Sequence, residues 1–449
     1  MAKPKNFKVI IVGGSVIGLT LANALERAGI DFVLLEKRQI APDLGASISL
    51  LCHSSRVYEQ LGVVDHFNAA TMPLLDRHNF SQDGCQFEDG GVLKGISVTN
   101  QVCGVSLSPC LVTISAKTQR PFRFLERRFY LQTLYNNLQD QSKVHTQASV
   151  KSFVETDCGV TVFTDDEQRY EGSILVGADG VHSIVRQLMS QAATATDPAR
   201  AKNLMSPFTA SYRAIFATSQ NINPDTQRPY MPDGTMHVVY HQGVSGLAAT
   251  GVEGLVFWFL FVKEDKTTRA PDCPRYSEED AEATINQFGH LNLGSDYTFR
   301  DLWNCKIKAA MFPMEEGVIK GSWNNGGRVV LLGDSASKAT INAGLGGNTH
   351  VEGVCHLVNE MMELLQHSPE PCTDEITEMF NKYEEKQRPR AELTVTLSSF
   401  TTRYEAMETW WMRSLMPVMR WLPVGLMSTL LAKYFAAGPL IKFPPRSDA

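Results

Sequence analysis

The sequence predicts an α/β fold with a parallel sheet, an inserted mixed β-sheet and a C-terminal helical tail. An apolar run at residues 9–12 leads into a glycine-rich turn and then into a segment with helical periodicity. The same order of strand, glycine turn and helix returns near residues 177 and 333. The stretch 237–262 is rich in β-branched and aromatic residues and partly alternates, which is typical of strands in a mixed sheet.

Composition limits the classes of protein to consider. The chain has 449 residues, 43% hydrophobic and 20% charged, so we expect two or three units with a sizeable core. A net charge of −6 argues against nucleic acid as a partner. Nine scattered cysteines without a CxxC pair, and a start that runs directly into a strand, predict free thiols and an intracellular setting. No Cys/His spacing indicates zinc, so no metal is expected.

The first turn has the pattern of a dinucleotide-binding unit. A strand over 9–12, buried on both faces, precedes Gly13, Gly14 and Gly18, and helical periodicity follows over 17–27. Glycines at such a turn let the backbone approach a pyrophosphate at the helix N-terminus. An ordinary strand–turn–helix is the less favoured alternative.

The second strand of this unit ends in an acid. Glu36 is placed to accept hydrogen bonds from a ribose diol, and its charge repels a 2′-phosphate. The nucleotide is therefore FAD or NAD rather than NADP. Ser15 occupies the middle glycine position of GxGxxG, which weakens the motif, but the strand, the helix and the acid around it restore the prediction.

The two later turns are too widely spaced for a tandem repeat. One long ligand contacted at three points explains them better. Asp334, at a strand end, could hold a polyol hydroxyl, and the glycine-rich stretch 344–347 before a long helix could place N–H groups against a phosphate or a flavin edge.

This order of motifs resembles the FAD-dependent monooxygenases of the para-hydroxybenzoate hydroxylase type, and most of all the fungal epoxidases of meroterpenoid and indole-diterpene biosynthesis. The fungal group commonly reads GGS in the first turn, which fits Ser15. The resemblance covers Val9 to about Leu440 and rests on the stretches 13–38, 44–50, 124–135, 177–186, 256–263 and 333–335.

The resemblance implies a Rossmann-like FAD-binding domain with an inserted mixed β-sheet substrate domain. The FAD-binding domain is expected over 1–75, 125–205 and 310–400, the substrate domain over 76–124 and 206–309, and the helical tail over 401–449.

The resemblance also implies roles for single residues. Glu36 binds the adenosine ribose, Arg127 contacts FAD, Asp334 binds the ribityl chain, and Asp179 belongs to a motif linked to both FAD and NAD(P)H. The stretch 45–49 lies along the flavin. The full cofactor-binding set is Gly13, Gly14, Ser15, Gly18, Glu36, Lys37, Ala46, Ser49, Arg127, Asp179, Asp334, Gly346, Gly347 and Asn348.

Two positions depart from the family motif GDxxHxxxP. Ser337 stands for the histidine and Ile341 for the proline, which normally fixes backbone beside the reactive edge of the flavin. We expect retained FAD binding with an altered substrate pocket or altered chemistry; harmless drift is the alternative. His53 could reach the flavin pocket or face solvent, and we favour solvent.

The chemistry implied is that of the cofactor. NAD(P)H, bound transiently because no second nucleotide unit is visible, reduces FAD, and O₂ supplies the oxygen atom that is transferred. Arg213 is the candidate for orienting the substrate or the peroxide, and Tyr240 for proton donation. A surface arginine and a sheet tyrosine are the open alternatives.

The tail, residues 407–445, is apolar and aromatic but interrupted by charges. Its longest uncharged run, 421–432, is too short to span a bilayer. An interfacial membrane anchor and helices packed on the catalytic domain both remain open. The location expected is intracellular, either cytoplasmic or at a membrane such as the face of the endoplasmic reticulum.

The predicted function is epoxidation of an alkene in a prenylated or terpenoid natural product, with a hydrophobic small molecule as substrate. Open alternatives are indole 2,3-epoxidation with rearrangement to a spiro-oxindole, aromatic hydroxylation, Baeyer–Villiger insertion, and a flavoprotein fold that acts as a non-redox cyclase. The oligomeric state stays open.

Overall fold

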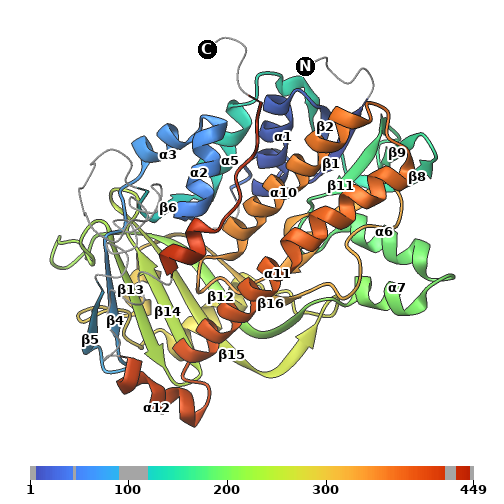
Figure 1. Ribbon diagram of the computed structural model, residues 1–449. Helices are drawn as coiled ribbons and strands as arrows, with labels where there is room; N and C mark the ends of the chain where they lie inside the picture. Colours follow the sequence, from blue (N-terminus) through green and yellow to red (C-terminus); the bar gives the residue numbers. More distant parts are fainter. Residues whose placement is uncertain (1–6, 44–46, 91–119, 420–430, 445–449) are drawn as a thin grey trace, which may run out of the picture.

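A parallel sheet forms one half of the molecule in the computed structural model, which describes residues 7–43, 47–90, 120–419 and 431–444 (Figure 1). All its neighbouring strands run parallel, in the order β17-β11-β1-β2-β7. The residues of β1 and β11 are almost all buried, as expected for strands covered on both faces. The strands are β1 (Lys8–Val12), β2 (Asp31–Glu36), β7 (Val144–Thr146), β11 (Ile174–Gly177) and β17 (Val329–Leu331).

Helices far apart in the sequence pack around this sheet. The long helices α10 (Gly346–His367) and α11 (Thr373–Glu405) lie side by side, and α10 also packs against α1 (Val16–Ala28) (Figure 1). Through these contacts the glycine-rich start of α10 lies next to the parallel sheet. The other helices here are α2 (Cys52–Leu61), α3 (Val64–Ala70), α5 (Arg127–Asn136), α6 (Ile184–Ala193) and α7 (Pro198–Met205).

The second half is a mixed eight-stranded sheet in the order β18-β16-β12-β15-β14-β13-β4-β5. The β13–β4 pair is parallel and the other neighbours are antiparallel, so the predicted mixed sheet is present. Its strands are β4 (Asp76–Phe80), β5 (Gln86–Gly90), β12 (Thr209–Gln220), β13 (Thr235–His241), β14 (Val244–Ala249), β15 (Leu255–Arg269), β16 (Lys306–Val318) and β18 (Ser337–Lys338).

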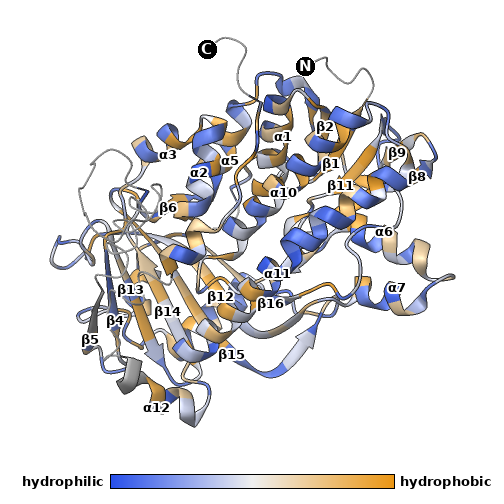
Figure 2. Ribbon diagram, viewed as in Figure 1, coloured by the Kyte–Doolittle hydropathy of each residue, from blue (hydrophilic) through white to orange (hydrophobic). Residues whose placement is uncertain are grey.

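Each face of this sheet buries its own apolar cluster, because side chains alternate along a strand. The outer face packs against α8 (Glu278–Phe288) and α9 (Phe299–Asn304). The inner face meets the end of α11 and includes Tyr212, Met236, Tyr240, Leu247, Phe259, Phe261 and Met314. Figure 2 shows hydrophobic residues concentrated in strands such as β11 and β13, whereas α11 is largely hydrophilic.

Two small sheets complete the fold. One pairs β3 (Ser47–Leu50) with β6 (Arg123–Glu126), and the other joins β8 (Val150–Thr156), β9 (Gly159–Thr164) and β10 (Arg169–Gly172). Two predicted domain boundaries fall within secondary-structure elements. The boundary at 310 falls inside β16, because that strand continues its pairing with β12 to Glu316, and the boundary at 400 falls inside α11.

The described part of the tail contacts both halves of the molecule. Arg413 in its helix lies 3.4 Å from Gln242 of the large-sheet half, and the segment that follows packs on the half with the parallel sheet (Figure 1). After α12 (Trp410–Met419), residues 431–444 return to α2 and α10, where Gln60 Nε2 donates to the Ile441 carbonyl at 2.8 Å. Within the described ranges, no helix has both the length and the apolarity needed to cross a bilayer. The seven cysteines described are free thiols.

The expectation that His53 faces solvent was wrong. Its side chain is fully buried, 3.6 Å from Glu352, and it stacks on Phe435 of the returning segment at 5.1 Å between ring centroids. Burial lowers the pKa of His53 to about 3, so the imidazole is neutral. Sequence gave no sign of this contact because the partner lies 382 positions further along the chain.

Candidate functional site

The three glycine turns predicted from the sequence meet at one end of the parallel sheet. A Cβ on Gly13, whose φ is 108°, would lie 2.5 Å from the carbonyl oxygen of Ala178 in the second turn. A Cβ on Gly333, in the third turn, would lie 3.3 Å from Ile17 of α1. The three segments therefore abut one another although they are more than 150 residues apart.

The start of α1 is built for close approach of a ligand. A Cβ on Gly18 would overlap the Gly13 carbonyl oxygen, so only glycine allows this tight turn into the helix. Ser15 is the N-cap of α1 but makes no side-chain cap bond, so its hydroxyl leaves the N–H groups of the first turn to another acceptor. An anion is the natural acceptor at such a position.

Glu36 lies at the edge of this turn. Its Oε2 accepts from the Gly14 N–H at 2.6 Å, and its Oε1 accepts from the Arg38 N–H at 2.9 Å. Lys37 next to it is exposed. The acid predicted to bind a ribose diol is therefore held against the glycine turn by two backbone donors.

Arg127 begins α5 opposite the start of α1. Its Nη2 donates to Ser15 Oγ at 3.1 Å. Burial lowers the pKa of Arg127, while the charges of Glu36 and Asp334 act in the opposite direction. A half-buried guanidinium that feels the charges of two acids and lies beside a helix N-terminus suits a pyrophosphate.

Asp179 uses one carboxylate oxygen to cap a helix. Oδ2 accepts from the backbone N–H of Ile184 at 2.7 Å and of Val185 at 3.2 Å. Oδ1 is buried and has no hydrogen-bond partner among the described residues. Burial raises the pKa of Asp179, and such an unpaired buried oxygen fits a site that is completed by a ligand.

Asp334 is the most strongly held carboxylate of the site. Lys338 Nζ pairs with Oδ2, and His350 Nδ1 lies 3.0 Å from Oδ1. Burial works against ionisation, but Lys338 and His350 lower the pKa of Asp334 far below its usual value. His350 Nε2 in turn contacts Ser337 Oγ at 3.1 Å. An imidazole thus lies beside Asp334 although the motif position for it holds a serine.

The glycine stretch before α10 is tied to β3. Asn348 Oδ1 accepts from the Leu51 N–H at 3.0 Å, and its Nδ2 donates to the Ser49 carbonyl at 2.9 Å. Ser49 Oγ donates to the Gly344 carbonyl at 3.1 Å. The two segments predicted to lie along the flavin are therefore neighbours; Ala46 lies outside the described residues.

The start of α10 leaves space beside its backbone. A Cβ on Gly347 would meet nothing within 4 Å, and the N-cap Leu345 makes no side-chain cap bond. The site therefore offers both donors and acceptors to FAD. The donors are the free N–H groups at this helix start and Arg127, and the acceptors are Glu36 and the ionised Asp334.

Comparison with known proteins decides the family. The family described as "FAD binding domain" matches residues 6–398. The chain belongs to this family. Among its relatives are the FAD-dependent monooxygenases cdmI of Talaromyces verruculosus, 31% identical over 97% of this chain and 83% of the relative, and ausM of Penicillium brasilianum, 34% identical over 88% and 78%. The relative spyC of Aspergillus fumigatus is 37% identical over 82% of this chain and 72% of its own.

Solved structures show the same fold at low identity. Klebsiella pneumoniae HpxO complexed with FAD and uric acid has a TM-score of 0.73 at 16% identity, covering 96% of this chain and 97% of that one. CtdE in complex with FAD and a substrate has a TM-score of 0.67 at 15% identity, covering 96% and 99%. The chain is thus a flavin-dependent monooxygenase with FAD as cofactor, and NAD(P)H and O₂ are the co-reactants expected for this family.

The two catalytic candidates of this monooxygenase lie on opposite faces of the large sheet. Tyr240 belongs to the inner face, where its ring contacts Tyr404 at 5.8 Å. Arg213 follows Tyr212 on β12 and points to the other face, where it pairs with Glu264 at 2.9 Å. The structure does not bring Arg213 to the FAD motifs, and its role in catalysis stays a prediction.

Several polar contacts near the site could not be predicted from the sequence. Glu405, Arg77 and Asn342 meet on the inner face from three separate segments, and His350 reaches Asp334 from α10. Neither spacing nor motif connects them in the sequence. Within the described ranges, no group of His, Cys, Asp and Glu could hold a metal ion.

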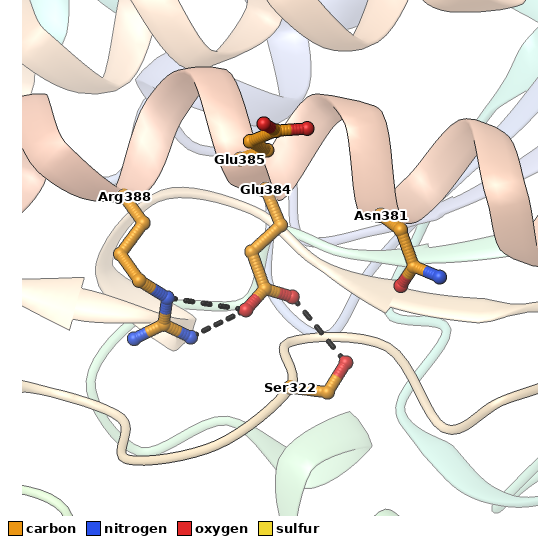
Figure 3. A pocket seen from close by; sticks show the side chains of 5 residues that line it. All are labelled: Ser322, Asn381, Glu384, Glu385 and Arg388. Atoms are coloured by element: carbon orange, nitrogen blue, oxygen red, sulfur yellow. Dashed lines mark hydrogen bonds and ion pairs between the residues drawn. The ribbon is translucent and has the colours of Figure 1, made fainter.

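A separate polar pocket lies on α11 (Figure 3). Glu384 accepts from the Trp323 N–H at 2.7 Å and from Ser322 Oγ at 3.3 Å, and Arg388 donates to the Ile319 carbonyl at 2.9 Å. Glu384 and Arg388 also pair with each other, as the dashed lines in Figure 3 show. These contacts fasten a loop to α11 and leave this pocket outside the catalytic site.

Proposed function

We propose that this monooxygenase epoxidises an alkene of a prenylated or terpenoid natural product in secondary metabolism. The observation that carries the proposal is the apolar lining of the inner face next to the glycine-rich stretch. Ile341, which precedes that stretch, packs with Phe124 and Phe216 in the same cluster as Phe259 and Phe261. Such a surface suits a large hydrophobic substrate whose reacting group is an uncharged double bond.

The chain's own part in this reaction is positioning and exclusion of water. FAD, when bound, supplies the oxygen-activating chemistry. Glu36, Arg127 and Asp334 would hold the cofactor from its adenosine end to its ribityl chain. The aromatic inner face would hold the alkene and keep water away, since a dry site strengthens the polar contacts within it.

The test is oxygen transfer to a defined alkene. Purified holoenzyme would be mixed with NADPH, ¹⁸O₂ and either a farnesylated phenol or a prenylated indole, with NADH in parallel to establish the nicotinamide preference. We expect substrate-stimulated NAD(P)H oxidation and a product with one ¹⁸O in an epoxide. A spiro-oxindole from the indole substrate would favour the alternative reaction at the indole 2,3-bond.

A non-redox cyclase is the other alternative, motivated by Ser337 and Ile341. Isomerised product without NAD(P)H consumption or ¹⁸O would support it. The contact of His350 with Asp334 weakens that motivation, because an imidazole is present at this carboxylate despite the serine in the motif.

A further inference from the structure

Glu405 is an acid buried on the inner face of the large sheet. It is the last residue of α11, and its side chain is 2% exposed. It lies directly before Ala406, which packs in the same apolar cluster as Tyr240 and Ile341. Burying a charged carboxylate in such surroundings costs free energy unless it is paired or protonated.

One oxygen of Glu405 is bound to the loop that precedes α10. Asn342 Nδ2 donates to Oε2 at 2.7 Å, and Asn342 Oδ1 accepts from Thr402 Oγ1 at 2.8 Å. Asn342 is followed two residues later by Gly344, whose carbonyl contacts Ser49 and Asn348 of the flavin-side segments. The acid is therefore fixed to the loop that joins the cofactor motifs to the substrate side.

The other oxygen has no hydrogen-bond donor within reach among the described residues. Its nearest cation is Arg77, with Nη2 at 3.7 Å from Oε1. The same Nη2 lies 3.5 Å from the Tyr240 hydroxyl, and Arg77 Nε donates to Asn79 at 3.1 Å. Oε1 thus lies near a guanidinium without a hydrogen bond to it.

Two nearby acids differ from Glu405 because each forms a close ion pair. Glu408 is 3.0 Å from Lys263 and accepts from Tyr212 at 2.7 Å, and Glu316 is 2.6 Å from Arg403. Among the residues that the structure describes, Glu405 has one neutral amide at short range and one more distant arginine. Burial therefore outweighs Arg77 and Asn342 and raises the pKa of Glu405 to about 7.

We propose that Glu405 is the proton donor of the substrate site, delivering the proton on Oε1 to an oxygen atom of the bound substrate or product. The proposal rests on the proposed function, which places the substrate on this face. The Oε1–H bond breaks as the new O–H bond forms, and Arg77 and Asn342 stabilise the carboxylate that remains.

For an epoxide, this step opens the ring. The C–O bond breaks as the proton arrives, and both of its electrons stay on the oxygen. The carbon next to the cationic centre then loses a proton to Glu405, which gives an allylic alcohol. Protons and electrons balance without another reactant, because the acid that gives the proton recovers one. The enzyme would then release an isomerised alcohol alongside the epoxide.

Infrared spectroscopy of the FAD-loaded enzyme tests the proton directly. The wild type should show a protonated-carboxyl band at pH 6 that disappears with a midpoint near pH 7, and Glu405→Gln should lack it. Glu408→Gln is the matched control and should retain the band. Absence of the band in the wild type at pH 6 would overturn the proposal, and this measurement needs neither substrate nor turnover.

Turnover tests the role of the proton. With the farnesylated phenol, Glu405→Gln should lower formation of the ring-opened alcohol by about 100-fold or more, the contribution typical of a general acid. The FAD content of Glu405→Gln should match the wild type, which shows that the variant is folded, and Glu408→Gln should form the alcohol normally. If Glu405→Gln forms the alcohol with unchanged yield and pH profile, the inference is refuted. If the wild type shows no NADPH oxidation at all, the proposed function is contradicted instead.

Discussion

His350 lies between Asp334 and Ser337, with Nδ1 3.0 Å from Asp334 Oδ1 and Nε2 3.1 Å from Ser337 Oγ. Nε2 is hydrogen-bonded to Ser337, Nδ1 lies at ion-pair distance from Asp334, and the ring is buried. The histidine is contributed by α10 instead of by the GD turn itself. The serine in the motif has a definite function in this arrangement, because its hydroxyl holds the ring that holds the carboxylate.

We predict that His350→Ala weakens FAD binding. Without the imidazole, Asp334 keeps Lys338 as its partner but loses the 3.0 Å contact with His350 Nδ1. Loss of a polar contact to a charged group costs about 1.5–3 kcal/mol, or roughly tenfold or more in affinity. Fluorescence titration of apoprotein with FAD measures the change. Ser337→Ala should have a smaller effect in the same direction; equal affinity in His350→Ala and the wild type would contradict the prediction.

A second prediction concerns two glycines of the cofactor motifs. Gly18→Ala should abolish FAD binding and lower the melting temperature, because its Cβ would overlap the Gly13 carbonyl oxygen. Gly347→Ala should leave the melting temperature of the apoprotein unchanged, since its Cβ meets nothing within 4 Å.

If Gly347 lies against the flavin, as predicted from the sequence, the alanine should still weaken FAD binding. Apoprotein melting and FAD titration of both variants separate the two effects. Normal FAD affinity in Gly347→Ala would remove this residue from the cofactor site.

The fold could be predicted because its signals are local. The strand at 9–12, the glycine turn and Glu36 lie within 30 residues, and the pattern of each is read directly from the chain. The stretch 237–262 could be assigned to strands for the same reason, because its β-branched and aromatic residues form a local pattern. The predicted boundary at 310 falls inside β16, because strand pairing, which decides where β16 ends, is a long-range property.

The polar contacts of the site could not be predicted for a related reason. Glu405 and Arg77 are separated by 328 positions, and His350 reaches a motif that begins 17 residues earlier. Side-chain pairing across such distances depends on packing rather than on periodicity. For Arg213, the strand position alone did not indicate which face its side chain would occupy, and its catalytic role stays a prediction.

A third prediction concerns stability and pH. The pKa of Glu405 rises from 4.5 to about 7 on folding, so the stability that its neutral form contributes is fully present below pH 4.5 and is lost as pH rises through 7. Relative to Glu405→Gln, the wild type should lose roughly 3 kcal/mol of unfolding free energy between pH 5 and pH 8. Urea unfolding with saturating FAD at several pH values gives this difference.

Glu408→Gln provides a control of opposite sign. Burial is outweighed at Glu408 by Tyr212 and Lys263, which lower its pKa, so its contribution is present above the ordinary value of 4.5 and is lost as pH falls. Between pH 5 and pH 8 the difference between Glu408→Gln and the wild type should therefore stay constant, and it should shrink only as pH falls below 4.5. Parallel pH profiles for the two variants would show that the change does not come from Glu405.

A fourth prediction concerns the returning C-terminal segment. Arg390 holds Glu352 with two bonds of 2.7 and 2.8 Å, donates to the Tyr434 carbonyl at 2.7 Å, and lies over the Tyr434 ring. Arg390→Gln leaves a carboxylate that is 2% exposed without its cation, which should cost about 3 kcal/mol. Thermal unfolding measures the loss. Arg169→Gln, which removes an exposed pair with Glu171, should change stability little.

The last prediction tests whether the tail meets a membrane surface. Leu393, Leu397 and Phe400 are exposed on successive turns of α11, and Phe400 stacks on Trp411 at 6.4 Å between ring centroids. Trp410 beside them is 74% exposed. Adjacent exposed apolar side chains ending in two tryptophans are typical of a surface that lies in the bilayer interface, so we propose that this surface binds lipid.

Vesicles of phosphatidylcholine and phosphatidylserine provide the test. The double variant Trp410→Ser/Trp411→Ser should bind them at least about tenfold more weakly in a sedimentation assay, because two aromatic side chains no longer enter the interface. Phe312→Ser is the control, since Phe312 is also 46% exposed but lies on β16. If both variants and the wild type sediment equally, the exposed tryptophans do not anchor the protein, and the described tail only packs on the rest of the chain.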